Sequence, residues 1–190
     1  MGITQKSIER LESHKCLQKG IKMLELGAQN TYDNKNYGDI AKDVFTLLGV
    51  DHTSIDLYPH QGALEADLRE KITLFDHKFD VITNFGTTEH MDGDLYDGFK
   101  NIHDLCRIGG LMIHENPKIN NWPKHGYHYM TKKFYIKLVE LTGYKLLELT
   151  EEAAMGNFES GWNICAVLEK TNDNEFISQE DFETLDYRKS

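Results

Sequence analysis

The chain has 190 residues, which suits one domain with a real core, and its formal charge of -10 gives a pI near 5.3. This acidic balance argues against broad binding to nucleic acid or anionic lipid, because both require a basic face. Its apolar runs are far shorter than the roughly 20 residues of a membrane-spanning helix, and three widely spaced cysteines predict a reducing, cytoplasmic setting.

Hydrophobic spacing predicts strands that alternate with helices through most of the chain. The predicted strands are Lys22–Leu26, His52–Leu57, a short strand within 64–68, Phe79–Asn84, Leu111–His114, Tyr144–Leu149 and Trp162–Glu169. The predicted helices are 3–18, 39–48, 94–107, which Gly109-Gly110 should end, and one that Thr131 starts and Gly143 stops. Between the second and third strands, the usual crossover helix is missing or reduced to a loop.

This order predicts an α/β fold, a Rossmann-like, doubly wound and mostly parallel sheet of seven strands. No helix separates the last two strands, so we expect one antiparallel strand near the C-terminus. We predict a single domain with an N-terminal helix over residues 1–170 and an acidic tail over 171–190. This tail should be frayed or form a short docked helix.

Acidic side chains and a glycine mark the ends of the first three strands. Gly27 follows the first strand and lies two residues after Glu25, while Asp56 and Asp67 lie near the ends of the next two. Carboxyl ends of parallel strands share one edge, and glycine lets a ligand approach the backbone there. The set predicts a site for a cationic adenosyl ligand. Alternatively, the acids are solvated strand ends and the glycine is only a tight turn.

Six segments resemble, in order and spacing, successive motifs of class I S-adenosylmethionine-dependent methyltransferases: KMLELGAQNT, SIDLYP, GALEADL, FDVITNFGTTEHM, CRIGGLMIHENP and HGYHYMTKKFYIKLVELTGYKLLEL. The fourth is similar to the small-molecule O-methyltransferase branch with a Glu-His motif. The resemblance implies S-adenosyl-L-methionine as cofactor, held by Glu25, Gly27, Asp56, Leu57, Asp67, Leu68 and Asn84. Gln29 and Thr31 replace glycines of the family's turn, and their side chains could narrow the pocket.

The Glu89-His90 pair is the candidate for the acceptor chemistry. His90 can act as general base toward a hydroxyl, with Glu89 orienting it; alternatively, Glu89 favours a helix start and His90 is structural. Related quinone and RNA methyltransferases bind a divalent metal with such a pair, so metal-assisted deprotonation is a second interpretation. Gly86 stands where the RNA enzymes have another glutamate, so at most a metal site with fewer ligands is available. A divalent metal is therefore possible but not favoured, and we prefer the acid-base interpretation.

Two further segments could reach the acceptor. In WPKHGYHYMT, His128 is a weaker third catalytic candidate, whereas His125 is either a further ligand or base or a surface group. Trp122, Tyr127 and Tyr129 of the same segment could wall the pocket. The residues that close the fifth strand, His114, Glu115 and Asn116, should all point to the same crevice or serve as caps.

The sequence thus predicts a methyltransferase that transfers a methyl group in line to an oxygen of a small polar metabolite. One alternative is a degenerate, non-catalytic subunit that binds S-adenosylmethionine. Another is a nucleic-acid methyltransferase, which the acidic charge opposes. The expected partner is a small-molecule acceptor, and we expect no binding to a membrane. The sequence does not indicate the oligomeric state.

Overall fold

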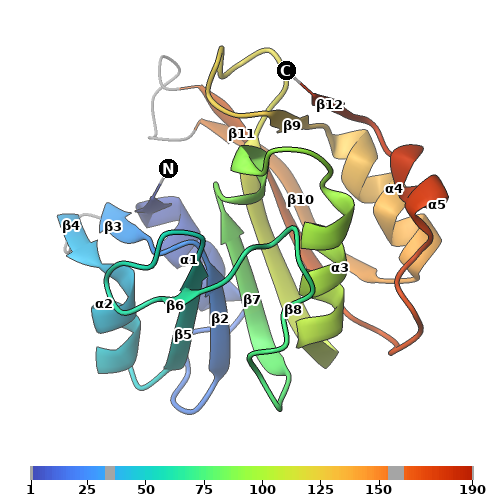
Figure 1. Ribbon diagram of the computed structural model, residues 1–190. Coiled ribbons are helices and arrows are strands. Elements are labelled where there is room, and N and C mark those ends of the chain that lie inside the picture. Colours follow the sequence, from blue (N-terminus) through green and yellow to red (C-terminus); the bar gives the residue numbers. More distant parts are fainter. Residues whose placement is uncertain (1, 33–36, 154–160, 190) are drawn as a thin grey trace.

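The computed structural model describes residues 2–32, 37–153 and 161–189 (Figure 1). A seven-stranded sheet forms its centre, with the order β10-β11-β8-β7-β2-β5-β6. Its strands are β2 (Lys22–Leu26), β5 (Asp51–Asp56), β6 (Leu64–Glu65), β7 (Phe79–Phe85), β8 (Cys106–Pro117), β10 (Lys145–Ala153) and β11 (Trp162–Glu169). The strand order agrees with an α/β sheet that is wound outward from β2 and β7.

Strand direction places the ends of five strands on one edge. The pairs β2·β5, β2·β7, β5·β6 and β7·β8 are parallel. Strand β11 is antiparallel to both of its neighbours, β8 and β10. The turns after β2, β5, β6, β7 and β8 therefore lie at the same edge, where open α/β sheets bind ligands.

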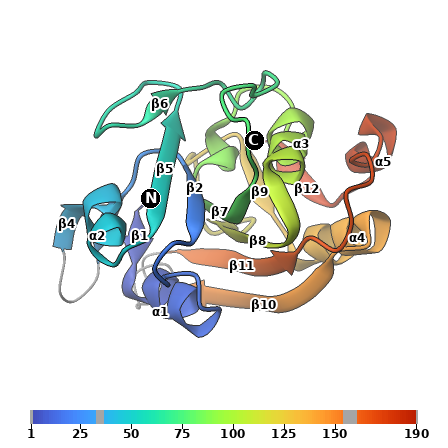
Figure 2. The same cartoon turned by 90° about the horizontal axis from the view of Figure 1, so that it is seen from below.

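Helices cover both faces of the sheet, and Figure 2 shows α1 and α3 on opposite sides of it. The helices α1 (Gln5–Ser13) and α2 (Ala41–Leu47) bury Leu11 and Phe45 in one core. The helices α3 (Tyr96–Leu105), α4 (Lys132–Thr142) and α5 (Gln179–Glu183) bury Phe99, Phe134 and Phe182 in the other. The longest of these helices has 11 residues, and no described helix is long and apolar enough to cross a membrane.

Short elements complete the fold. The strands β1 (Ile3–Thr4), β3 (Asn30–Tyr32) and β4 (Tyr37–Ile40) form one small sheet, and β9 (His128–Met130) pairs with β12 (Tyr187–Lys189) in another. A 3-10 turn, η1 (Thr88–His90), follows β7. No helix lies between β5 and β7, so the missing crossover helix is confirmed. The strands β3 and β4 were not expected, because two- to four-residue strands leave no clear periodicity.

Two expected helix boundaries were wrong. Helix α1 ends at Ser13 rather than residue 18, and Lys15 follows in a left-handed conformation with φ of 59°. Gly109-Gly110 lies within β8 rather than after α3, where the β7·β8 register shifts. The buried Lys170 Nζ instead donates to the carbonyls of His103 and Cys106, at 2.7 and 3.0 Å, at the end of α3. The ammonium group of a lysine that is distant in the sequence therefore binds the carbonyl groups at the end of α3, where the two glycines were expected to end the helix.

The described part of the tail is docked, one of the two expected outcomes. Phe176, Phe182 and Leu185 are buried against α3 and α4. His103 Nε2 donates to the carbonyl of Asn174 at 2.8 Å, and β12 extends the small sheet with β9. The division of the chain at residue 170 remains a prediction.

Candidate functional site

A cavity of about 650 Å³ opens at the carboxyl edge of the sheet. It is lined by residues 27–29 after β2, 55–58 at the end of β5, 66–69 after β6, 86–87 after β7, 90–92 around the end of η1, and Tyr127. Of the predicted site residues, the lining includes Gly27, Asp56, Leu57, Asp67, Leu68 and His90. It does not include Glu25, Asn84, Glu89 or His128.

Asp56 is fixed in the cavity wall by the backbone. Its Oδ2 accepts from the amide of Ala28 and its Oδ1 from the amide of Tyr58, both at 2.9 Å. Each carboxylate oxygen keeps a second lone pair for a ligand. The arrangement is suited to accept hydrogen bonds from a pair of hydroxyl groups, such as those of a ribose.

Asp67 also lines the cavity, but Arg69 occupies its carboxylate. Arg69 donates to both oxygens from Nε, at 2.9 and 3.0 Å, and from Nη2 at 2.6 Å. These hydrogen bonds lower the pKa of Asp67 below its ordinary value. The buried Asn101 of α3 holds the same loop by donating to the carbonyls of Leu68 and Glu70. No pattern in the sequence indicated this role of Asn101.

The turn after β2 contains the predicted glycine, and the side chains of Thr87 and Gln29 occupy the space beside it. Gly27 has φ of 78°, and a Cβ there would lie 2.7 Å from Thr87 Oγ1 and 2.9 Å from Gln29 Nε2. Gln29 lines the cavity, as expected for a side chain that narrows it. Thr31 is instead buried and donates to the carbonyl of Asp39, so it does not line the cavity.

Glu25 lies behind this turn. Its Oε2 is 3.2 Å from His52 Nε2 on β5, and both side chains are buried. Burial raises the pKa of Glu25, and the contact with His52 opposes this rise. Glu25 therefore lies under the ligand edge, and its contact with a ligand amino group stays a prediction.

Glu89 and two histidines form a cluster beside the cavity. The Oε1 atom of the fully buried Glu89 is 3.8 Å from His90 Nε2 and 3.8 Å from His125 Nε2. The two imidazole rings are 4.9 Å apart. Burial lowers the pKa of His90, which the Glu89 carboxylate opposes, so its imidazole is mostly neutral near pH 7. A neutral imidazole in the cavity wall can accept a proton.

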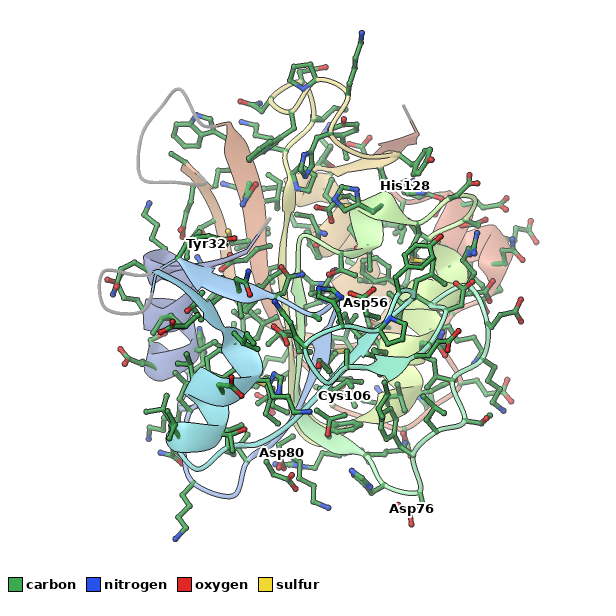
Figure 3. All side chains as sticks on the ribbon, turned by 60° about the vertical axis from the view of Figure 1, so that its left-hand side comes forward. Tyr32, Asp56, Asp76, Asp80, Cys106 and His128 are labelled. Atoms are coloured by element: carbon green, nitrogen blue, oxygen red, sulfur yellow. The ribbon has the colours of Figure 1, made fainter. Side chains whose placement is uncertain are left out.

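The other predicted residues around Glu89 are buried supports. Asn84 donates to Thr88 Oγ1 at 2.8 Å and accepts from the Thr88 amide, so it holds η1 in place. His128 Nε2 donates to the carbonyl of Met91 at 3.0 Å, and its ring contacts Tyr187. Figure 3 shows His128 well separated from Asp56. Catalytic contact by His128 and cofactor contact by Asn84 stay predictions.

The three residues at the end of β8 were expected to point to one crevice, but they do not. His114 and Asn116 lie on the face of α3 and α4, where they contact Phe99 and Tyr135. Glu115 lies on the other face, paired with Arg10 of α1. The expectation was wrong because successive side chains of a strand alternate between the two faces.

Of the expected aromatic wall, only Tyr127 lines the cavity. The Tyr129 hydroxyl donates to the carbonyl of Trp122 at 2.6 Å and accepts from the amides of His125 and Gly126. The amide of Tyr127 donates to the carbonyl of Glu89 at 2.7 Å. These bonds tie the 122–129 loop to η1 and bring His125 to Glu89.

The cluster also fits a divalent metal, the interpretation that we had considered possible but did not favour because Gly86 stands in place of an acid. His125 supplies the third donor, and one donor atom from each of Glu89, His90 and His125 lie within 4.8 Å of one another. Glu89 Oε1 and His125 Nε2 are buried and have no hydrogen-bond partner among the described residues. Two imidazoles and one carboxylate are a common ligand set for divalent transition metals.

No protein-family model matches the chain, and no curated protein matches it in sequence. Its fold is similar to that of solved structures. For the Burkholderia thailandensis 1,6-didemethyltoxoflavin-N1-methyltransferase, solved with 1,6-didemethyltoxoflavin and S-adenosylhomocysteine, the TM-score is 0.64 at 15% identity over 86% of this chain and 76% of that one. For the N-methyltransferase NodS from Bradyrhizobium japonicum WM9, the TM-score is 0.57 at 14% identity over 87% and 88%.

A third similar structure is the [4+2]-cyclase SpnF, with a TM-score of 0.62 at 12% identity over 88% of this chain and 83% of that one. One sheet architecture therefore serves more than one reaction, and function has to be argued from the site. The chain has the α/β fold, with a mostly parallel sheet, of S-adenosylmethionine-dependent methyltransferases.

Proposed function

We propose that this protein is an S-adenosylmethionine-dependent methyltransferase that methylates an oxygen of a small polar molecule. The observation that carries the proposal is the cavity itself, which joins the fixed Asp56 carboxylate to the His90 imidazole. One end offers acceptors for ribose hydroxyls, and the other offers a base. The solved methyltransferases of similar fold, two of them with S-adenosylhomocysteine, support this cofactor.

The charges of the cavity favour a cationic ligand. Asp56, Asp67 and Asp92 line it, and the guanidinium of Arg69 is paired with Asp67. A sulfonium near these carboxylates gains Coulomb energy, whereas its neutral thioether product does not. The lining therefore favours the substrate form of the cofactor over the product form.

When bound, S-adenosylmethionine would supply the methyl group, with the S–CH₃ bond breaking as the acceptor O–CH₃ bond forms and the electron pair staying on sulfur. His90 takes the proton that the acceptor hydroxyl loses. Glu89 stabilises the resulting imidazolium from 3.8 Å. Tyr127 and Met91 of the cavity wall would hold the acceptor beside the methyl group and limit the access of water.

Calorimetry with S-adenosylmethionine tests cofactor binding. We expect binding, and we expect Asp56→Ala to weaken it by at least about tenfold, because hydrogen bonds to a carboxylate contribute roughly 1.5–3 kcal/mol each. Asp76→Ala is the matched control, since Asp76 is exposed and lies far from Asp56 (Figure 3). An absence of binding at millimolar ligand would refute the proposal.

Release of S-adenosylhomocysteine in the presence of phenols, catechols and hydroxy acids tests turnover. We expect His90→Ala to lower kcat by at least about tenfold, at the low end of the contribution of a general base. His77→Ala is the control, because His77 is exposed and lies outside the cavity lining. Unchanged kcat in the His90 variant would remove this residue from the mechanism.

A metal-assisted reaction is a second candidate, favoured by the buried Glu89 Oε1 and His125 Nε2, which find no hydrogen-bond partner in the part of the chain that the structure describes. Glu89, His90 and His125 would hold the ion, which would lower the pKa of a bound acceptor hydroxyl. Calorimetry with Co²⁺ should then detect one site that His125→Ala abolishes. Activity that resists a chelator would leave His90 as the base.

A non-catalytic protein that binds S-adenosylmethionine is the main rival. Gln29 beside Gly27 motivates it, because this side chain takes space near the turn. Cofactor binding without methyl transfer to any acceptor class would favour this rival. A nucleic-acid methyltransferase has less support. Both the cavity and the whole chain are acidic, and a negative surface repels the phosphates of nucleic acid.

A further inference from the structure

Asn116 joins Glu89 to helix α4 through a chain of buried hydrogen bonds. Its Nδ2 donates to Glu89 Oε2 at 3.1 Å and to Thr88 Oγ1 at 3.2 Å. Its Oδ1 accepts from the Tyr135 hydroxyl at 2.7 Å. All four side chains are fully buried, so water does not compete for these bonds.

The amide of Asn116 can take only one orientation. An asparagine side chain has one accepting and one donating end, and the neighbours decide which end faces which way. Tyr135 donates to Oδ1, and Asn84 Nδ2 lies 3.4 Å from the same oxygen. Two donors on one side leave the amide hydrogens for Glu89 on the other.

This orientation determines which oxygen of Glu89 is available. Oε2 is held by Asn116, while Oε1 faces His90 and His125 at 3.8 Å each. Gly126 closes the remaining side, since a Cβ there would lie 3.1 Å from Glu89 Cγ. The carboxylate is thus fixed through Oε2, while Oε1 has no hydrogen-bond partner within the described ranges of the chain.

We infer that Asn116, fixed by Tyr135, is a positioning residue that directs Glu89 Oε1 toward the two histidines of the site. The inference rests on the proposed function for its kinetic consequence, but not for its geometry. Asn116 does not line the cavity; it holds the Glu89 carboxylate directly and the η1 turn through Thr88, and it acts on the site through these two contacts. The same interaction would orient Glu89 as a metal ligand, where residues behind a ligand commonly matter.

The decisive variant is Asn116→Asp, which has nearly the same shape. In its ionised form the aspartate still accepts from Tyr135 and Asn84, but it cannot donate to Glu89 and adds a like charge beside it. A residue that only fills space and accepts from Tyr135 would be replaced well by aspartate. A positioning residue would not, and Asn116→Asp should perform no better than Asn116→Leu.

Imidazole NMR of ¹⁵N-histidine-labelled protein tests the geometry without an acceptor or a metal. We expect Asn116→Asp and Tyr135→Phe to move the signals of His90 and His125 and to leave that of exposed His60 unchanged. Tyr144→Phe is the matched control for Tyr135→Phe, because it removes another buried hydroxyl, bonded to His103 Nδ1 at 2.6 Å. Signals of His90 and His125 that match the wild type in Asn116→Asp would overturn the inference.

Kinetics then measure the consequence. We expect Asn116→Asp to lower kcat by at least about tenfold, while calorimetry shows affinity for S-adenosylhomocysteine within about twofold of the wild type. If the wild type transfers the methyl group and Asn116→Asp shows no loss of kcat, the inference is also overturned. If the wild type transfers no methyl group, the proposed function fails, and the NMR comparison still decides whether Asn116 positions Glu89.

Discussion

A buried carboxylate lies on each face of β8, and the two differ in how fully their oxygens are hydrogen-bonded. On the α1 face, Glu115 pairs with Arg10 and accepts from Ser7 Oγ at 2.7 Å. On the α3 and α4 face, Asn116 bonds one oxygen of Glu89 and leaves the other without a hydrogen-bond partner among the described residues. Burial alone therefore does not mark a functional acid.

The difference distinguishes a structural acid from the acid for which we propose a chemical role. Arg10 also binds Glu148 through Nε at 2.9 Å and pairs with Glu152, so three acids share one buried guanidinium. This cluster joins α1 to β8 and β10. A buried oxygen that lacks a partner, in contrast, is costly to keep and is typically retained where a ligand or proton will use it.

The largest expected effect is on the Glu115 face. We expect Arg10→Met to lower the free energy of unfolding by about 3–5 kcal/mol, because it leaves Glu115 buried without its cation. Chemical denaturation at pH 7 measures this loss. The double variant Arg10→Met with Glu115→Gln should recover part of it, since no unpaired buried charge then remains; a double variant as unstable as the single one would contradict the account.

A smaller effect concerns His114, on the Glu89 face. Burial lowers the pKa of His114 from 6.5 to about 3, and its neighbours Asn84, Phe99 and Tyr135 carry no charge. Below pH 6.5 the unfolded chain binds a proton that the folded chain refuses, so stability falls as pH falls toward 3. The loss approaches about 1.4 kcal/mol per pH unit below pH 6.5 and amounts to about 1.7 kcal/mol between pH 6.5 and 5.

Denaturation curves at pH 6.5 and pH 5 measure this slope. His114→Asn keeps an acceptor for Asn84 but does not titrate in this range, so its stability should change less between the two pH values. His103 also has a pKa lowered by burial, and it accounts for part of the remaining slope. An unchanged slope in the His114 variant would show that its burial does not govern the acid sensitivity.

The sequence predicted the central sheet of the fold well, because buried strands and capped helices leave local signals. Strand 22–26 and strand 162–169 were predicted with their observed bounds. Thr131 and Gly143 also act as expected, with Thr131 Oγ1 accepting from the Phe134 amide and Gly143 left-handed. The Gly109-Gly110 bulge was missed, because its conformation depends on pairing with β7 and on Lys170 rather than on local sequence.

The site was predictable as a set of strand ends but not as a set of contacts. Gly27, Asp56 and His90 reach the cavity because strand direction alone places them there. The pairing of Glu25 with His52 and the approach of His125 to Glu89 join segments far apart in the sequence. No spacing rule encodes such contacts, since they depend on the path of a loop.

The smallest expected effect on stability belongs to Glu89. We expect Glu89→Gln to change the free energy of unfolding by less than about 1 kcal/mol, because glutamine can still accept from Asn116 and the cost of a buried charge disappears. Glu115→Gln should lose about 1.5–3 kcal/mol with its charged hydrogen bonds to Arg10. Turnover should respond in the opposite order, with a loss of at least about tenfold only in the Glu89 variant. Equal losses of stability in the two variants would mean that both carboxylates are structural, whatever their distance from the cavity.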